Sequence, residues 1–184
     1  MKSTTPLIDL VEEAVRLPAV ESIVERLRGG LCELIDSGAA ALPAAFTRCL
    51  DDHYARRLVH ENLARGYSIV AMAWGPRQGT ALHDHAGLWC VESVWQGSIE
   101  VHQYELLEQR DGWYRFEKCG SIRAGIGSAG CLIPPHEYHV ICNPSDRPAV
   151  SVHIYGGSMR YCNVFEDRGD GWYRRSPKPL GLDA

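Results

Sequence analysis

The sequence predicts an all-β domain, either a sandwich or a barrel, that follows a helical segment. From Tyr67 onward the chain consists of short stretches with β-type composition, which turn residues separate at short intervals. No helical pattern occurs between these stretches. The first third of the chain instead places apolar residues at helical spacing. At 184 residues the chain has the length of one domain.

Two N-terminal helices are predicted from their apolar stripes. The first stripe covers residues 7–17, and Pro18 ends or bends it. The second stripe covers residues 20–35 and is interrupted at Gly29-Gly30. Stripes of this kind more often face a core than bind a cofactor, so we assign no chemistry to them.

A third helix is predicted to open at Pro43 and to run toward His60. We therefore assign residues 1–62 to a helical segment packed on the barrel, and residues 63–184 to the barrel itself. No Pro-rich or Ser-rich linker separates these two parts, so they are expected to form a single structural domain.

The predicted strands lie between pairs of turn residues such as Gly-Pro and Asp-Gly. The sequence Asp-Gly-Trp-Tyr-Arg occurs twice, at 111–115 and 170–174, and both copies are typical of hairpin turns rather than of a repeat. The predicted strands are Tyr67–Trp74, Leu88–Trp95, Ile99–Leu106, Trp113–Cys119, Cys131–Ile133, His139–Cys142, Val150–Tyr155, Tyr161–Glu166 and Trp172–Arg174.

Composition and charge exclude several classes of partner. The chain carries 19 Lys and Arg against 23 Asp and Glu, a net charge of −4, without a basic face that could neutralise phosphates. We therefore expect no nucleic-acid partner. No apolar stretch reaches the roughly 18 residues of a membrane span, so no membrane partner is expected either.

The same features predict a cytoplasmic protein. Asp9, Glu12 and Glu13 occupy the place where a signal peptide needs an apolar core. Seven cysteines are scattered without a Cys-x-x-Cys pair, which indicates reduced thiols rather than disulfides or a zinc ribbon.

His83 and His85 form the first candidate metal site. Residues two apart in a strand project to the same face, so both imidazoles would point into the barrel and Asp84 would point away. Neutral imidazole is a common ligand of iron, zinc and copper. A His-x-His pair alone is weak support for a metal, because surface strands also contain it by chance.

The residues that follow resemble the first sequence motif of the cupin proteins. Four residues separate His85 from Cys90, and six more separate Cys90 from Gly97. The cupin motif is His-x-His-x(3,4)-Glu-x(6)-Gly, so this chain has cysteine in the position of glutamate. The resemblance implies a cupin β-barrel whose usual carboxylate ligand is missing.

A second segment resembles the other cupin motif, Pro-x-Gly-x-x-His-x-x-x-Asn. Pro134, His139 and Asn143 occupy its positions, and His136 replaces its glycine. The resemblance adds His139 to the two earlier histidines as a third metal ligand. The alternative is that His139 is a core histidine with satisfied hydrogen bonds. Three neutral imidazoles would leave the full charge on a divalent metal, which favours an anionic ligand such as a thiolate.

A third cluster of polar residues narrows the resemblance to one family. Ser151, His153 and Tyr155 lie on one face of a predicted strand that is otherwise apolar. This Ser-x-His-x-Tyr segment closely resembles the outer-sphere triad of the cysteine dioxygenases, cupin enzymes that hold ferrous iron with three histidines. Tyr54 and Arg56 belong to a Tyr-x-Arg-x-Leu segment that is similar to the one ahead of the barrel in that family.

The resemblance implies how metal and substrate are bound. His83, His85 and His139 would hold Fe(II). Arg56 would pair with the substrate carboxylate, because a planar guanidinium fork matches a carboxylate, and Tyr54 would lie beside it. The neighbouring Arg57 shows that this assignment could shift by one residue.

The resemblance also implies roles for the second group of site residues. Tyr155 would lie near the thiolate and dioxygen sites, His153 would hold its hydroxyl, and Ser151 would orient His153. Cys90 lies where some members carry a cysteine joined to the tyrosine by a thioether. The alternative is that Cys90 is a buried, inert thiol.

The activity implied is an iron-dependent oxidation of L-cysteine by dioxygen to cysteine sulfinic acid. Arg56 favours L-cysteine, because the related 3-mercaptopropionate dioxygenases typically carry glutamine there. The expected partners are a small thiol and O2. Three alternatives remain, namely a 3-mercaptopropionate dioxygenase, a zinc cupin acting as isomerase or hydrolase, and a non-catalytic cupin that binds a ligand. The sequence does not indicate an oligomeric state.

Overall fold

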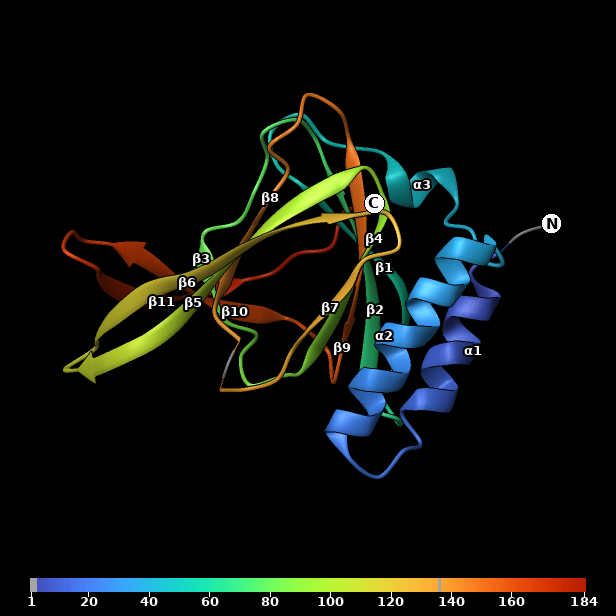
Figure 1. Cartoon of the computed structure of the whole chain (residues 1–184), viewed down its shortest axis with the longest axis horizontal. Helices are drawn as coiled ribbons and strands as arrows, with labels where there is room; N and C mark the ends of the chain where they lie inside the picture. Colours follow the sequence, from blue (N-terminus) through green and yellow to red (C-terminus); the bar gives the residue numbers. More distant parts are fainter. Residues whose placement is uncertain (1–2, 136) are drawn as a thin grey trace.

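A computed structural model describes residues 3–135 and 137–184 of the chain (Figure 1). Position 136, where the second motif departs from the cupin pattern, lies outside these described residues. Within them the helices are α1 (Thr5–Ala14), α2 (Val20–Ser37) and α3 (Ala44–Thr47). The strands are β1 (Ala55–Asn62), β2 (Tyr67–Trp74), β3 (Leu82–His83), β4 (Cys90–Gln96), β5 (Ser98–Arg110), β6 (Trp113–Gly125), β7 (Ala129–Leu132), β8 (His139–Cys142), β9 (Ala149–Tyr155), β10 (Tyr161–Asp167) and β11 (Trp172–Pro179).

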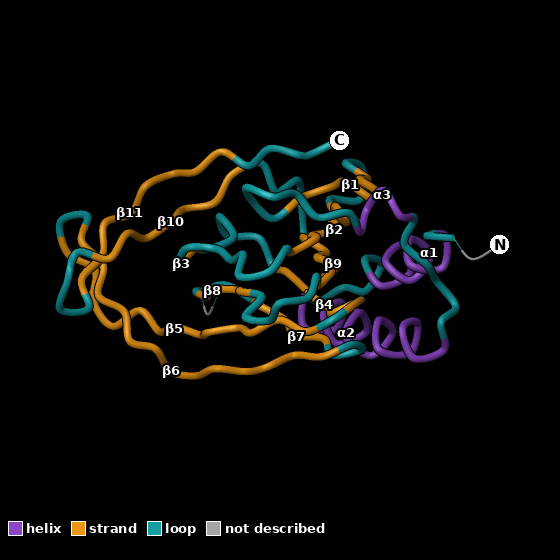
Figure 2. The backbone as a smooth tube through the Cα atoms, turned by 90° about the horizontal axis from the view of Figure 1, so that it is seen from above, coloured by secondary structure: helices purple, strands orange, loops and turns teal. Residues whose placement is uncertain are grey.

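The strands form an open sheet and a closed barrel. The sheet has the order β1-β2-β9-β4-β7, and β10-β11-β6-β5-β8-β3 close on themselves. Neighbouring strands pair in antiparallel fashion in both. Figure 2 shows β10 and β11 opposite β5 and β6, with β3 and β8 between them. The predicted class, an all-β barrel fold with an N-terminal helical segment, is confirmed.

The helices α1 and α2 lie side by side and cover the outer face of the five-stranded sheet (Figure 1). Their apolar stripes bury Leu7 and Leu27 against Val91 of β4 and Ile154 of β9. Each fully buried side chain of this size stabilises the fold by about 1.5–3 kcal/mol. Among the described residues no helix is both long and apolar enough to cross a membrane.

The second predicted helix is α2, which runs unbroken through Gly29 and Gly30 although its apolar stripe is interrupted there. Gly30 allows α1 and α2 to pack closely against each other. A Cβ atom on Gly30 would overlap the Leu10 side chain of α1 and meet the guanidinium of Arg26. The missing side chain therefore lets the two helices approach closely.

The third helix begins after Pro43 as predicted, but its predicted extent toward His60 is wrong. The helix α3 covers only Ala44–Thr47, and Ala55–Asn62 form the strand β1, which pairs with β2. The helical segment thus ends before residue 62. The polar residues of β1 suggested a solvated helix face, but Arg56 and Arg57 are buried and donate to carbonyls of the C-terminal residues. Such contacts between distant segments leave no trace in a local pattern.

The two Asp-Gly-Trp-Tyr-Arg copies form the hairpin turns that the sequence predicts. Asp111 and Asp170 both have positive φ angles, 51° and 54°, and each is followed by a glycine with positive φ. Two consecutive residues with positive φ make the turn that matches the twist of a hairpin. The copies also pair with each other, because Tyr114 of β6 lies opposite Tyr173 of β11.

Candidate active site

The strands β3 and β8 bring three histidines together. His83 lies on β3, His85 follows two residues later, and His139 lies directly opposite His83 as the first residue of β8. Their candidate ligand nitrogens all lie within 4.8 Å of one another. Ring centroids are 4.5 Å apart for His83 and His139, and 5.0 Å for His85 and His139. Two nitrogens bound to one metal at about 2.0–2.1 Å are at most about 4.2 Å apart, so the three rings lie near the arrangement that one ion requires.

The hydrogen bonds of the rings show which nitrogens are available to a metal. Nδ1 of His83 lies 3.0 Å from the carbonyl oxygen of Ala81, and Nδ1 of His139 lies 3.0 Å from that of Glu137. Because a carbonyl only accepts, both Nδ1 atoms carry the proton and both Nε2 atoms keep their lone pair. Nε2 of His139 and Nδ1 of His85 are buried without a hydrogen-bond partner among the described residues. The donor set therefore fits a metal cation, which would satisfy these nitrogens.

The three imidazoles are kept neutral by their surroundings. Burial lowers the pKa of His83. Burial, together with the neighbouring histidines, lowers the pKa of His85 and His139 well below the ordinary value. Neutral imidazole is the form that binds metal, so a cation can enter without first displacing protons.

Two carboxylates hold the histidine segment in place. Asp84 points away from the cluster and accepts hydrogen bonds from the backbone N–H of Asn163 at 2.8 Å and from its side-chain amide at 2.7 Å. These bonds tie β3 to β10. Glu137 accepts the backbone N–H of His85 at 3.2 Å, which ties the segment to the chain ahead of β8.

The two other motif residues have structural roles. Gly97 has a φ of 73°, and a Cβ there would meet the carbonyl oxygen of Pro148. The side-chain amide of Asn143 donates to the carbonyl oxygens of Trp74 and Arg147. Both residues shape turns at a distance from the histidines, so neither belongs to the candidate site.

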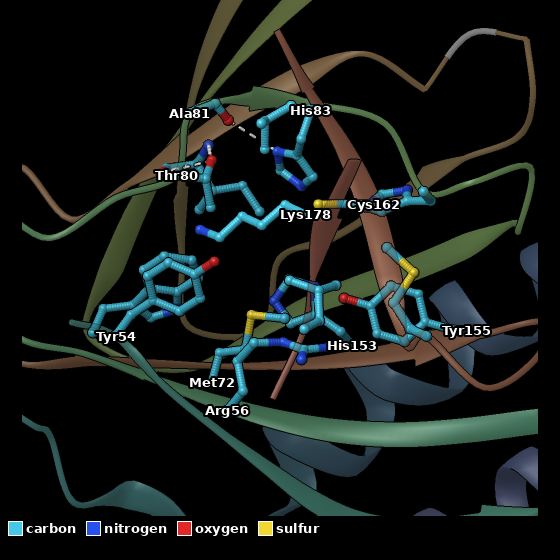
Figure 3. Close-up of a pocket in the computed structure, with 16 residues that line it drawn as sticks. Tyr54, Arg56, Met72, Thr80, Ala81, His83, His153, Tyr155, Cys162 and Lys178 are labelled. Carbon is cyan, nitrogen blue, oxygen red and sulfur yellow. Dashed lines mark hydrogen bonds between the residues drawn. The ribbon is translucent and has the colours of Figure 1, made fainter. Parts of the chain in front are cut away.

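The histidine cluster borders a small pocket (Figure 3). The pocket is small, so it suits a small molecule rather than a nucleotide or a peptide. Figure 3 shows His83 on one side and Arg56, His153 and Tyr155 on the other, with Lys178 extending between them. Among the described residues that line the pocket, none is acidic. Two cations without a carboxylate favour an anionic occupant.

The side chains of Arg56 and Arg57 lie in different surroundings. Arg56 lines the pocket, where its Nη1 donates to the carbonyl oxygen of Gly181 at 2.7 Å. Its Nη2 is buried and finds no partner within the described ranges. Arg57 lies on the opposite face of β1 and donates to the carbonyl oxygens of Arg48 and Ala184. Tyr54 also lines the pocket and stacks on Trp74 with ring centroids 4.5 Å apart.

The three polar residues of β9 are buried next to the pocket. Nε1 of Trp74 donates to Oγ of Ser151 at 2.8 Å, and Ser151 lies 2.8 Å from Nε2 of His153. Nδ1 of His153 lies 3.6 Å from a carboxylate oxygen of Glu92. The implied bond from His153 to the Tyr155 hydroxyl is therefore not what the structure shows. Both ring nitrogens of His153 face other residues, and its ring stacks on that of Tyr155 at 6.1 Å between centroids.

Cys90 of β4 and Tyr155 of β9 are direct partners across two antiparallel strands. Side chains of such a pair lie on the same face of the sheet. Both are fully buried, and burial raises the pKa of the thiol and of the phenol well above their ordinary values. The pair is thus protonated at neutral pH and adjacent, while the thioether bond between them stays a prediction.

Two site residues were missed by the sequence analysis. Glu92 lies two positions after Cys90, so strand alternation directs both side chains to the same face, and this signal could have found it. Lys178 lies on β11, far from every motif in the sequence, and no local pattern points to it.

Comparisons with known proteins point to one family. The sequence profile of the family described as cysteine dioxygenase type I matches residues 7–168. Cysteine dioxygenase type 1 from Bos taurus is 26% identical over 172 residues, which cover 88% of this chain and 80% of that one. The Homo sapiens protein of the same name is 25% identical over 124 residues, which cover 62% of this chain and 56% of that one. The match to the human protein thus spans about half of its length.

Solved structures with a related fold are more distant. A conserved protein with a double-stranded β-helix domain from Klebsiella pneumoniae has a TM-score of 0.49 and 19% identity, over 62% of this chain and 87% of that one. An RmlC-like cupin protein from Desulfovibrio desulfuricans has a TM-score of 0.47 and 21% identity, over 65% of this chain and 97% of that one. The profile match over residues 7–168 shows the family, and these two structural similarities add nothing to it.

Proposed function

Because the chain belongs to the cysteine dioxygenase type I family, we propose that it is an iron-dependent dioxygenase that converts L-cysteine to cysteine sulfinic acid. One observation carries the proposal. Two histidines of the cluster, His83 and His85, line the same small pocket as Arg56, whose Nη2 has no hydrogen-bond partner among the described residues. In the reaction RSH + O2 → RSO2H, both oxygen atoms end on sulfur. Sulfur loses four electrons and dioxygen gains them.

His83, His85 and His139 are the residues that would hold the iron. When bound, Fe(II) supplies open coordination positions and the redox chemistry through which a thiol and dioxygen react. The chain contributes three neutral donors and a buried surround that limits access of water. Since no carboxylate belongs to the cluster, the site favours a negatively charged sulfur ligand over a neutral one.

Arg56 would fix the substrate by its carboxylate. The bond from Nη1 to Gly181 orients the guanidinium, so Nη2 is left to donate to an incoming carboxylate oxygen. A charge-assisted bond in a site shielded from water is stronger than the same bond at the surface. Lys178 adds a second positive charge to the pocket. Together they would favour a thiol with a carboxylate over a thiol that carries only an amine.

Tyr155 would act on the oxygen atoms that sulfur gains. Burial raises the pKa of its hydroxyl, so the phenol keeps its proton at neutral pH and can donate a hydrogen bond. A donor placed where negative charge develops stabilises the transition state more than the ground state. His153 and Ser151 lie behind this ring and would hold its position.

The pocket also supports 3-mercaptopropionate as a second candidate substrate. This thiol has the carboxylate of cysteine but no amine, and no acidic residue among those described lines the pocket to receive an ammonium group. An ammonium group of L-cysteine would therefore have to donate to neutral acceptors such as the hydroxyl groups of Tyr54 and Thr80, which line the pocket. The reaction would be the same for both thiols.

Oxygen uptake by iron-loaded protein tests the proposal. L-Cysteine, 3-mercaptopropionate and cysteamine are compared, with the sulfinate product identified by mass spectrometry. We expect rapid turnover of L-cysteine, slower turnover of 3-mercaptopropionate and little of cysteamine. If metal analysis finds zinc after growth in iron-replete medium and no thiol consumes oxygen, the proposal of a zinc cupin replaces this one.

A further inference from the structure

A buried carboxylate lies behind the candidate site and is not used by the proposed reaction. Glu92 is only 6% exposed and lies on β4 directly opposite His153 of β9. Its Oε2 lies 3.6 Å from Nδ1 of His153 and has no hydrogen-bond partner among the described residues. A buried carboxylate without a partner is costly, so its presence in the five-stranded sheet calls for a reason.

The hydrogen bonds on the other side of His153 decide where its ring proton lies. The indole nitrogen of Trp74 can only donate, so Oγ of Ser151 accepts from it. The hydroxyl proton of Ser151 then points to its other neighbour, Nε2 of His153, which must accept it. In a neutral imidazole the remaining nitrogen carries the proton. The N–H at Nδ1 is therefore directed at Glu92.

We propose that Glu92 is a positioning residue, whose carboxylate accepts the Nδ1–H of His153 and thereby fixes the tautomer and orientation of that ring. Trp74, Ser151 and His153 form a hydrogen-bonded chain across β2 and β9. Glu92 of β4 lies 3.6 Å beyond it, a distance that a small side-chain movement would shorten to a hydrogen bond. The stacked ring of Tyr155 is held through His153. The effect on turnover rests on the proposed dioxygenase function, whereas the effect on the His153 tautomer does not.

Glu92 reaches solvent by a route separate from the substrate pocket. It does not line that pocket but a second cavity of about 340 Å³, bounded by β4, β5, β6 and β7. Apolar residues such as Val94, Ile99 and Leu132 form most of its wall. Protons can thus reach Glu92 while the substrate pocket is occupied. Glu92 acts on the site only through His153.

The surroundings of Glu92 determine the pH at which its carboxylate takes up a proton. The titratable groups that face it are His153 and Tyr155 from β9, Cys90 from its own strand, and Arg28, Arg123 and Cys131, which line the second cavity from α2, β6 and β7. Arg28 already pairs with a carboxylate oxygen of Glu25 at 3.2 Å. No cation is in contact with Glu92 in the described chain, and burial raises its pKa to about 7.

Protonation of Glu92 would reverse the chain of hydrogen bonds. A carboxylic acid can donate to Nδ1 of His153, which moves the ring proton to Nε2. Nε2–H then donates to Ser151, whose hydroxyl proton loses its acceptor. His153 should therefore change tautomer as the pH crosses about 7. This change of tautomer requires that Glu92 exchanges a proton with His153. A carboxylate with a merely structural role would not cause it.

The test follows the ring nitrogens of His153 by ¹⁵N NMR in the full metal-free chain, with the signal assigned by its loss in His153→Asn. In the unmodified protein we expect Nδ1 to carry the proton above the transition and Nε2 below it. In Glu92→Gln the transition should be absent. Ser93→Ala is the matched control, because the Ser93 side chain points to the other face of β4 and should leave the transition unchanged.

Kinetics of the iron-loaded enzyme give the second readout. Glu92→Leu removes the acceptor and should lower kcat for L-cysteine about tenfold, as expected for loss of a positioning hydrogen bond, with KM within about twofold. The acidic limb of its pH profile should disappear as well. A His153 ring that keeps its proton on Nε2 at every pH in the unmodified protein overturns the inference without the need for any variant. A tautomer change in a protein that oxidises no thiol supports the inference and overturns the proposed function.

Discussion

The guanidinium of Arg56 donates through Nη1 to the carbonyl oxygen of Gly181 at 2.7 Å. The same C-terminal segment binds β1 a second time, because the carboxylate of Asp183 accepts the backbone N–H of Arg56 at 2.8 Å. The arginine is thus held against the pocket before a substrate arrives. Preorganisation of this kind lowers the entropy cost of binding.

Replacing Arg56 should discriminate between thiols. Arg56→Gln removes the charge that would pair with the substrate carboxylate, and the loss of a buried charge partner typically costs about 2–5 kcal/mol. We expect kcat/KM for L-cysteine to fall accordingly and kcat/KM for cysteamine, which lacks the carboxylate, to change little. Steady-state oxygen uptake with both thiols measures the difference.

Arg57→Gln is the matched control for that experiment. Arg57 donates to Arg48 and Ala184 on the far side of β1, so its replacement should lower stability and leave the preference among thiols unchanged. Equal losses for L-cysteine and cysteamine in Arg56→Gln would show that Arg56 does not bind the carboxylate.

Cys90 and Tyr155 should become joined by a thioether during turnover. The thiol and the phenol would lose one hydrogen each, with dioxygen as the oxidant, and their strand pairing already makes them neighbours. Intact mass spectrometry after turnover in air should show a form lighter by two hydrogens. Cys90→Ser and Tyr155→Phe should lack it, whereas Cys162→Ser, another buried pocket cysteine, should keep it. Full alkylation of Cys90 after long turnover would refute the bond.

Glu92 should make the free energy of unfolding depend on pH. Its pKa is raised from 4.5 to about 7 in the folded protein, so the folded state binds more protons than the unfolded state between these values. Its contribution to stability is therefore complete below pH 4.5 and is lost as the pH rises through about 7. Relative to the unmodified protein, Glu92→Gln should gain free energy of unfolding across this range, on the order of 3 kcal/mol.

Denaturant unfolding at several pH values measures this trend. Glu12→Gln provides a control of opposite sign, because hydrogen bonds from Tyr67 and Asn62 lower the pKa of Glu12. The stability that Glu12 contributes is present above its ordinary pKa and is lost as the pH falls. Parallel trends for the two variants would contradict the assignment of a raised pKa to Glu92.

Two adjacent glycines in α2 should respond to alanine in opposite ways. Gly30→Ala places a Cβ against Leu10, which should destabilise the helix pair by about 1–3 kcal/mol. Gly29 has open space around its Cβ position, so Gly29→Ala should stabilise the protein by about 0.4–1 kcal/mol through helix propensity. Thermal unfolding of both variants tests the packing. A destabilised Gly29→Ala, or a neutral Gly30→Ala, would be inconsistent with it.

Much of the barrel could be predicted from the sequence because its strands are short, apolar and bounded by turn residues. Tyr67–Trp74 and His139–Cys142 were placed to the residue. The strand β3 was missed because two residues, Leu82 and His83, are too few to show a pattern. The strand β1 was missed because its arginines are buried by hydrogen bonds to backbone oxygens more than a hundred positions away.

Some residues of the candidate site could likewise be predicted from the sequence, and others could not. The histidines could be nominated because His83 and His85 alternate on a strand and His139 lies in a separate motif. Arg56 could not be distinguished from Arg57 without the strand that turns one toward the pocket and the other away. Glu92 has no motif, and only its pairing with His153 across two strands reveals its role.

Isotope labelling of the product shows whether both oxygen atoms of dioxygen are transferred to the substrate sulfur. Iron-loaded protein is given L-cysteine under ¹⁸O2, and the sulfinate is analysed by mass spectrometry. The proposed dioxygenase should place two labelled oxygen atoms on each sulfinate, and His139→Ala should bind no iron and form no sulfinate. His102→Ala, at a histidine on β5 outside the cluster, should behave like the unmodified protein. Cystine or unlabelled sulfinate as the only product, or full activity in His139→Ala, would contradict the account.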